Sequence, residues 1–172
     1  MEDRISDKNY LKNTLKCNVF TIKKLFPKKD TRLFEELTAV YNKNYDHLYM
    51  WHRNNSEFSF NNKDELLNYL FKNKVLCFVL MISGKVIGFI GITNVSKDRD
   101  SIYNRHISYW IDKENARKGI MFNAISLLEK TSLFNNTHYL ETSVYSENIA
   151  SIKLLEKLKF KKGRIIFDCE QR

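Results

Sequence analysis

The sequence predicts a mixed α/β fold in which a mostly antiparallel sheet contains one parallel pair of strands. Three observations lead to this class. Apolar runs of strand length at 74–82, 85–95 and 103–111 are joined by short polar connections, so these strands should be antiparallel. A helical pattern then separates the last of them from another strand-like run at 137–145, which is the arrangement of a right-handed parallel crossover. Finally, 172 residues with one proline and five glycines fit a single domain, 1–172, without a dividing linker.

The first half of the chain is expected to supply one strand and two helices. The strand spans 15–26 and ends at Pro27. Asp30 is a suitable N-cap for the first helix. The apolar residues of that helix recur at helical spacing, and they are Leu33, Phe34, Leu37, Val40 and Tyr41. The segment 45–60 is aromatic and polar without clean periodicity, which fits a short helix followed by a loop, and 62–72 is the second helix.

The second half of the chain is expected to alternate strands and helices. Ser83-Gly84 favours a hairpin between the first two antiparallel strands. A helix follows the third of these strands and runs to about Leu133. After the crossover strand come a helix at 146–158 and a final strand at 160–169.

The composition is that of a packed globular protein with a basic surface. Lys and Arg outnumber Asp and Glu by 29 to 20, and the net charge of +9 attracts polyanions such as nucleic acid, the ribosome or a phosphorylated cofactor. The cations are scattered, so solvated faces explain most of them. No apolar run approaches the roughly 18 residues of a membrane span, and the three separated cysteines fit free thiols, so we expect a cytoplasmic protein with no membrane partner. The Cys and His residues show no metal-ligand spacing, so we expect no metal.

Two transitions from strand to helix favour a cofactor site. At 109–121 a strand is followed by a short polar turn containing Gly119 and then by the start of a helix. Main-chain N–H groups and the positive end of the helix dipole point to one place there, which suits a phosphate. At 146–151 a second helix begins after the next strand. Two such transitions indicate a cofactor-binding core.

The residues at these transitions resemble the GNAT superfamily of acetyl-CoA-dependent N-acetyltransferases, especially its RimJ/RimL-like branch of ribosomal-protein N-terminal acetyltransferases. The similarity lies in Tyr-Trp-Ile-Asp at 109–112, Lys-Gly-Ile-Met at 118–121 and Asn-x-Ala-Ser-x-x-x-Leu-Glu-Lys-x-x-Phe at 148–160, and it extends over roughly 30–165. It implies a single GNAT domain, with a mostly antiparallel mixed sheet, a splayed parallel strand pair and helices on both faces.

The resemblance also implies where acetyl-CoA binds. The pantetheine arm is expected to lie along the strand edge near Trp110 and Ile111, and the pyrophosphate on the amides of 117–121. The residues assigned to the cofactor are Trp110, Ile111, Arg117, Lys118, Gly119, Ile120, Met121, Asn148 and Ser151. Taken by itself, Asn148 is equally suited to cap a helix. Ala116 stands where the phosphate loop of the family usually has Gln or Arg, so one side-chain donor is missing.

The implied chemistry is direct transfer of an acetyl group from a thioester to a neutral amine, which requires a proton for the departing thiolate. Many family members place a tyrosine acid seven residues beyond Asn148, and here that position is Leu155, which has no proton to give. In the RimL-like branch a serine serves instead, and Ser151 holds its place. Glu170 is the candidate base. The chain stops at Arg172, where the branch usually continues with another strand, so part of the acceptor pocket is expected to be missing or supplied by another chain.

The pKa values of amines limit which class of amine can serve as the acceptor. An α-amine has a pKa of about 7.7–8.0, so its neutral form costs about 1 kcal/mol at pH 7, whereas a lysine side chain costs about 4.6 kcal/mol. We therefore expect a peptide N-terminus or an aminoacyl group, with a small-molecule amine, a ribosome or tRNA association and a homodimer also open. Two other functions remain as alternatives: a catalytically impaired CoA-binding or dimer-forming GNAT-like protein, and a basic RNA- or ribosome-associated binding protein.

Overall fold

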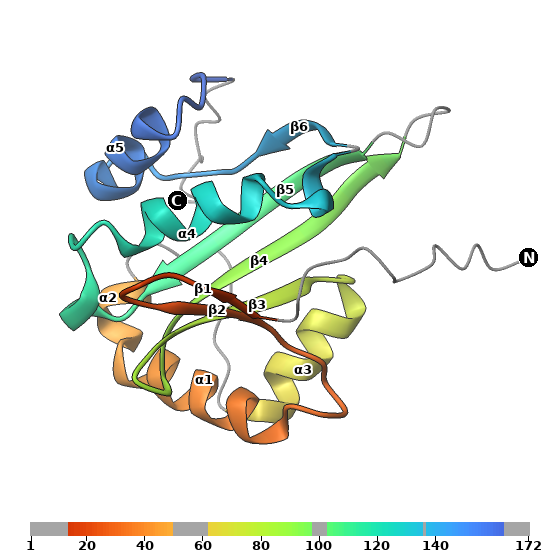
Figure 1. The fold of residues 1–172 in the computed structure, drawn as a ribbon, viewed down its shortest axis with the longest axis vertical. Coiled ribbons are helices and arrows are strands. Elements are labelled where there is room, and N and C mark those ends of the chain that lie inside the picture. Colours follow the sequence, from red (N-terminus) through yellow and green to blue (C-terminus); the bar gives the residue numbers. More distant parts are fainter. Residues whose placement is uncertain (1–13, 50–61, 98–102, 136, 164–172) are drawn as a thin grey trace, which may run out of the picture.

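In the part of the chain that the structure describes, a six-stranded sheet forms the centre, with the strands in the order β1-β2-β3-β4-β5-β6. The computed structural model describes residues 14–49, 62–97, 103–135 and 137–163 (Figure 1). The strands are β1 (Thr14–Lys16), β2 (Thr21–Lys24), β3 (Leu76–Ile82), β4 (Lys85–Lys97), β5 (Tyr103–Ile111) and β6 (Thr137–Glu141). Neighbouring strands from β1 to β5 pair antiparallel, and β5 pairs with β6 in parallel. The predicted fold class is confirmed.

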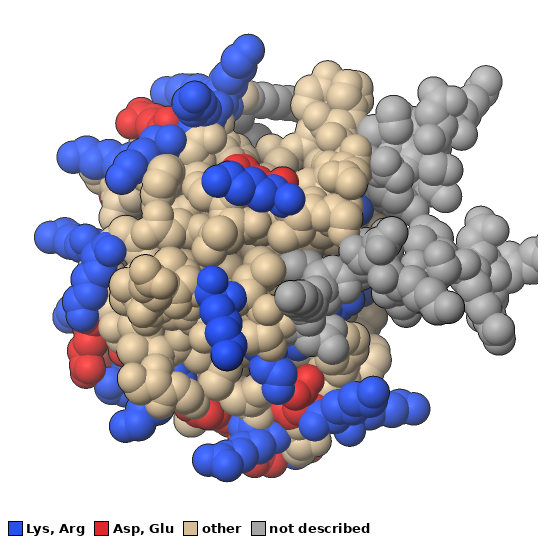
Figure 2. Space-filling view, viewed as in Figure 1, with Lys and Arg blue, Asp and Glu red and all other residues tan. Residues whose placement is uncertain are grey.

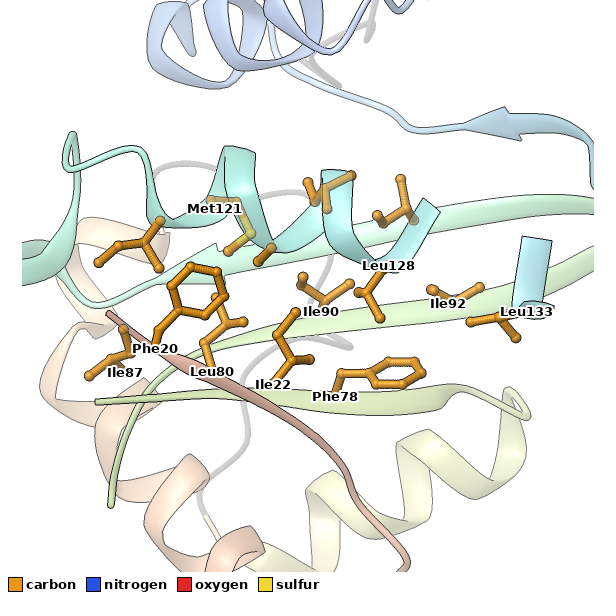
Figure 3. Packing of buried hydrophobic residues seen from close by; sticks show 14 residues of the cluster. Phe20, Ile22, Phe78, Leu80, Ile87, Ile90, Ile92, Met121, Leu128 and Leu133 are labelled. Carbon is orange, nitrogen blue, oxygen red and sulfur yellow. The ribbon is translucent and has the colours of Figure 1, made fainter. Parts of the chain in front are cut away.

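Helices cover both faces of this sheet, as predicted (Figure 1). Within the described residues they are α1 (Thr31–Lys43), α2 (Tyr45–Tyr49), α3 (Lys63–Lys72), α4 (Ile120–Glu129) and α5 (Ile149–Lys157), together with the short 3-10 turns η3 (Lys113–Asn115) and η4 (Ser132–Phe134). The side chains of α4 pack with those of the central strands in one hydrophobic cluster (Figure 3). The side chains of α1 and α3 form a second cluster on the other face. None of the described helices is long and apolar enough to cross a membrane.

Strand β3 shows how the sheet serves both clusters. Phe78 and Leu80 belong to the α4 cluster, whereas Cys77 and Val79 belong to the α1–α3 cluster. Successive side chains of a strand point to opposite faces, so a continuous apolar run is what a strand covered on both sides requires. The sheet is therefore held from both sides, and its later strands form a firm support for a site.

The N-terminal part departs from the prediction in two ways. The strand expected at 15–26 is a hairpin of β1 and β2, closed by a bond from Cys17 N–H to Phe20 O (2.8 Å) around Asn18, a residue type that favours turns. Asp30 does occupy the N-cap position of α1, but its side chain makes no capping bond. Its carboxylate instead accepts from Lys23 Nζ (2.6 Å) and from the Phe26 N–H (2.8 Å), which fastens the start of α1 to β2.

The C-terminal part also differs from the predicted boundaries. The helix expected to reach Leu133 ends at Glu129, because Thr131 is extended and its hydroxyl donates to Leu128 O (2.6 Å) before η4 begins. Strand β6 ends at Glu141 instead of 145, since its pairing with β5 stops there. The predicted strand at 160–169 has no strand geometry up to Gly163, and its remainder lies outside the described residues. In the segment 45–60, the expected short helix is α2, and residues 50–60 lie outside the described residues.

Candidate active site

The parallel strands β5 and β6 separate after a short stretch of pairing. Their register runs from Tyr103 opposite Thr137 to His106 opposite Glu141, and β5 then continues to Ile111 beyond the end of this pairing. Its other edge stays paired with β4 throughout. Among the residues that the structure describes, no strand pairs with 107–111 on the β6 side. The unpaired main-chain groups of such an edge can bind an extended ligand.

The loop between β5 and α4 is open where the sequence predicted a phosphate. Arg117 and Gly119 both have positive φ, 61° and 73°, and Gly119 is the N-cap of α4 without a side-chain capping bond. Turns of this kind gather main-chain N–H groups into a hollow that suits an anion. A Cβ added at Gly119 would meet nothing within 4 Å, so the main chain there can be approached closely. Arg117 and Lys118 are exposed, and Ile120 and Met121 are buried in the core, so the latter two can offer only main-chain N–H groups.

The loop is anchored by a buried polar contact that the sequence did not reveal. Asp112, 6% exposed, accepts from Asn44 Nδ2 at the C-terminus of α1 (2.8 Å) and from Asn115 Nδ2 (3.2 Å). Asn44 Oδ1 in turn accepts from the Lys113 N–H (2.9 Å). Because Asn44 and Asp112 lie 68 residues apart, no local pattern could have indicated this pairing.

The second transition positions Ser151. Asn148 is the N-cap of α5, and its Oδ1 accepts from the Ser151 N–H (3.1 Å), so its suitability as a helix cap is confirmed. The hydroxyl of Ser151 lies 2.6 Å from the hydroxyl of Tyr109 on β5. This bond connects the first turn of α5 to the part of β5 that no described strand pairs on that side. Leu155, the other position considered for an acid, is buried.

Tyr109 is the residue that sequence reasoning missed in this site. Burial raises the pKa of its phenol, although the hydrogen bond with Ser151 acts in the opposite direction. The phenol is therefore protonated at neutral pH and can donate to Ser151. Its sequence context, between apolar strand residues, indicates only a core position, and its partner is 42 residues away.

The side chains of Trp110 and Ile111 serve the core. The Trp110 ring contacts Tyr41 edge-on (5.7 Å between centroids) and stacks on Phe89 (6.3 Å), in the α1–α3 cluster. Ile111 packs on the α4 cluster. Any contact of these two residues with a cofactor would thus come from the main chain. Glu170, the predicted base, lies outside the described residues.

A comparison with protein families decides the identity of the fold. Residues 29–161 match the family model described as "Acetyltransferase (GNAT) domain". The chain belongs to the GNAT acetyltransferase family. The predicted family is confirmed. No curated protein sequence matches this GNAT chain at a significant level.

Solved GNAT structures share the fold at low sequence identity. The ribosomal-protein-S5-alanine acetyltransferase from Vibrio fischeri has a TM-score of 0.66 at 20% identity, covering 87% of this chain and 83% of that one. RimJ from Mycobacterium smegmatis, solved in complex with CoA-disulfide, has a TM-score of 0.65 at 17% identity, covering 84% and 71%. The aminoglycoside acetyltransferase meta-AAC0020, from an uncultured soil metagenomic sample and solved with sisomicin, has a TM-score of 0.67 at 14% identity, covering 90% and 98%. These similarities, all at or below 20% identity, establish the fold alone.

Proposed function

We propose that this GNAT protein transfers the acetyl group of acetyl-CoA to an α-amine, on a peptide N-terminus or an aminoacyl group. One arrangement carries the proposal. Where β5 and β6 separate, a strand edge that no described strand pairs lies between an open loop at Gly119 and a hydrogen-bonded pair of hydroxyls, Tyr109 and Ser151. A ligand with a diphosphate at one end and a thioester at the other fits that order of features.

The described residues suit acetyl-CoA. The open side of Gly119 and the first N–H groups of α4 would hold the pyrophosphate, with Arg117 and Lys118 adding positive charge. The edge of β5 at 110–111 would hold the pantetheine arm through main-chain bonds. Asn148 uses its Oδ1 for the helix cap and keeps Nδ2 as a donor for the same arm. When bound, acetyl-CoA supplies the acetyl thioester.

The pair of hydroxyls would handle the proton that the departing sulfur needs. Ser151 Oγ–H gives its proton at that position, and Tyr109 OH, held protonated by burial, replaces it. The proton that the amine loses as the amide bond forms and the C–S bond breaks would return to Tyr109 through water. Tyr109 also fixes the direction of the Ser151 hydroxyl through the 2.6 Å bond. Ser151 is therefore the catalytic residue, and Tyr109 acts through it.

The acceptor is assigned from the cost of deprotonation. An α-amine needs about 1 kcal/mol to be neutral at pH 7, which water can support, whereas a lysine side chain needs about 4.6 kcal/mol and a dedicated base. Glu170 remains the candidate for such a base. We therefore place α-amines ahead of lysine side chains as acceptors.

Calorimetry with acetyl-CoA, together with mass spectrometry of peptides incubated with it, tests the proposal. We expect acetyl-CoA binding and N-terminal acetylation, but no product from a peptide whose only amine is a lysine side chain. Gly119→Trp should abolish binding, because the ring occupies the space of the phosphate. Gly84→Trp is the matched control, since Gly84 also has a positive φ (79°) and an open Cβ position but lies in the turn between β3 and β4. Acetyl-CoA affinity that survives Gly119→Trp would refute the loop assignment.

The two alternative functions give different results in these experiments. A catalytically impaired member binds acetyl-CoA without forming any product. A basic RNA-associated protein binds RNA with a steep dependence on salt. Figure 2 shows Lys and Arg side chains spread over the visible face with Asp and Glu among them, which is the distribution of solvated surface charge.

A further inference from the structure

A hollow lies on the face of the sheet opposite Ser151. It is bounded by α1, α3, β4 and β5, and it is partly open to solvent. Helix α5, which carries Ser151, reaches β5 from the other face through the hydroxyl of Tyr109. The hollow is therefore separate from the predicted cofactor edge, but it shares β5 with it.

The walls of the hollow are apolar and aromatic. Tyr41, Tyr69, Phe89 and Trp110 contribute rings, and none of the described residues that line the hollow is acidic or basic. Burial, with a smaller contribution from Tyr45, raises the pKa of Tyr41 to about 12, so its phenol is neutral. A group with a formal charge would lose its hydration in such a place without gaining an opposite charge from these walls.

One of the two hydroxyl groups that α1 places in the wall, that of Thr38, is already engaged as a hydrogen-bond donor. Thr38 is buried, and its Oγ1 donates to Phe34 O (2.9 Å). The Thr38 hydroxyl therefore has no proton left to donate to a negatively charged oxygen of a bound molecule. This contact leaves the Thr38 position in the wall suited to carbon atoms.

The floor of the hollow connects it with the transfer site. It includes Ser108, Tyr109 and Trp110, which belong to the part of β5 that no described strand pairs on the β6 side. Tyr109 thus contacts the hollow and also bonds to Ser151. A molecule that fills the hollow with one group can present a neighbouring amine at this edge of β5.

We propose that the hollow binds an uncharged apolar or aromatic group that the acceptor carries next to its reactive amine. Acceptors whose α-amine stands on a large apolar residue are then preferred over glycine, acidic or polycationic acceptors. The proposal rests on the proposed function and adds the class of acceptor to it. Burying a Leu or Phe side chain in such a hollow corresponds to a preference of about 10- to 100-fold over glycine.

Peptides that differ only in the first residue test this preference. For X-Ala-Ala-Ala with X as Phe, Leu, Gly or Asp, we expect kcat/KM to be about 10- to 100-fold higher for Phe and Leu than for Gly, and lowest for Asp. Sisomicin, which carries several amines, should be a poorer acceptor than the Phe peptide. Equal rates for Phe and Gly, or a faster reaction with sisomicin, would overturn the proposal.

A second arm distinguishes the acceptor from the acyl donor as the source of the apolar group. Acetyl-, butyryl- and hexanoyl-CoA are compared with the Gly peptide as acceptor. We expect acetyl-CoA to be the best donor. If hexanoyl-CoA is preferred and the first residue of the peptide has no effect, the hollow holds the acyl chain and the proposal is wrong.

Two variants of α3 locate the effect in the hollow. Tyr69→Ala removes an aromatic wall and should lower the Phe-to-Gly ratio of kcat/KM by about 3- to 10-fold. Phe71→Ala, on the exposed side of the same helix (59% exposed), should leave the ratio unchanged. Both peptides are assayed on one preparation, so partial unfolding cancels from the ratio. An unchanged ratio in Tyr69→Ala contradicts the proposal.

Binding without turnover separates this inference from the proposed function. Calorimetry should show phenylalaninamide binding at least ten-fold more tightly than glycinamide, even if no peptide is acetylated. Tight phenylalaninamide binding without acetylation would refute the proposed function and keep the hollow. Acetylation with equal affinity for both amides would keep the function and refute the hollow.

Discussion

Replacement of Tyr109 by Phe tests the proposed path of the proton with the smallest available change. The ring and its packing remain, and only the hydroxyl 2.6 Å from Ser151 is removed. A hydrogen bond between neutral groups contributes about 0.5–1.5 kcal/mol net, so kcat should fall by about 2- to 10-fold. Removing the donor itself in Ser151→Ala should cost more, about 100-fold or above.

Single-turnover and steady-state measurements of acetyl-peptide formation distinguish this role from a structural one. Tyr109→Phe should lower kcat while the KM of the peptide and the Kd of acetyl-CoA stay unchanged. In a Ser151→Ala background the same change should have no further effect, because Tyr109 acts through Ser151. Tyr139→Phe, on the exposed side of β6, is the matched control and should retain full activity. Full activity in Tyr109→Phe, or an additive loss in the double variant, would refute the reasoning.

Three further predictions concern stability. Asn44→Ala removes a hydrogen-bond donor from the buried Asp112 carboxylate and should lower the free energy of unfolding, measured by urea denaturation, by about 1–3 kcal/mol. Asn73→Ala is the control: it removes an equivalent helix C-cap that has no such buried partner, and it should lower the free energy of unfolding by less. Burial lowers the pKa of His106 despite the opposing charge of Glu141, so the unfolded chain binds a proton more readily below about pH 6.5. Stability should therefore fall on acidification from pH 7 to 5, by less in His106→Gln than in the wild type, and an equal fall in both proteins would contradict this. Leu128→Ala, at a position with 0% exposure, should cost about 2–5 kcal/mol, and a loss below 1 kcal/mol would mean that the core collapses around the site.

The fold was predictable because it depends on patterns that are local in the sequence. The short polar turns around the central strands set the antiparallel order, and the helical pattern between β5 and β6 set the parallel crossover. Element ends were less predictable, since they depend on partners. Strand β6 ends where its pairing with β5 ends. The Asp30 carboxylate accepts hydrogen bonds from Lys23 and Phe26 instead of capping its own helix.

The site was predictable only in part, for the same reason. Gly119 and Asn148 stand out because a glycine before a helix and an asparagine at a helix start have local meanings, and the structure places both at helix N-caps. The contacts Asn44–Asp112 and Tyr109–Ser151 join residues 68 and 42 positions apart. The folded arrangement of strands and helices creates them, and neither partner carries a signal of the other.

Strand β5 has the proposed cofactor edge on its β6 side and the hollow on its α1–α3 face, and this position has a consequence for the order in which the two reactants bind. One reactant would reach the strand from its open edge and the other from the α1–α3 face, so occupancy of one approach leaves the other clear. Either reactant can then arrive first, and both must be present together before any bond changes. Initial-velocity lines in a double-reciprocal plot should accordingly intersect, whereas a modified-enzyme route would make them parallel.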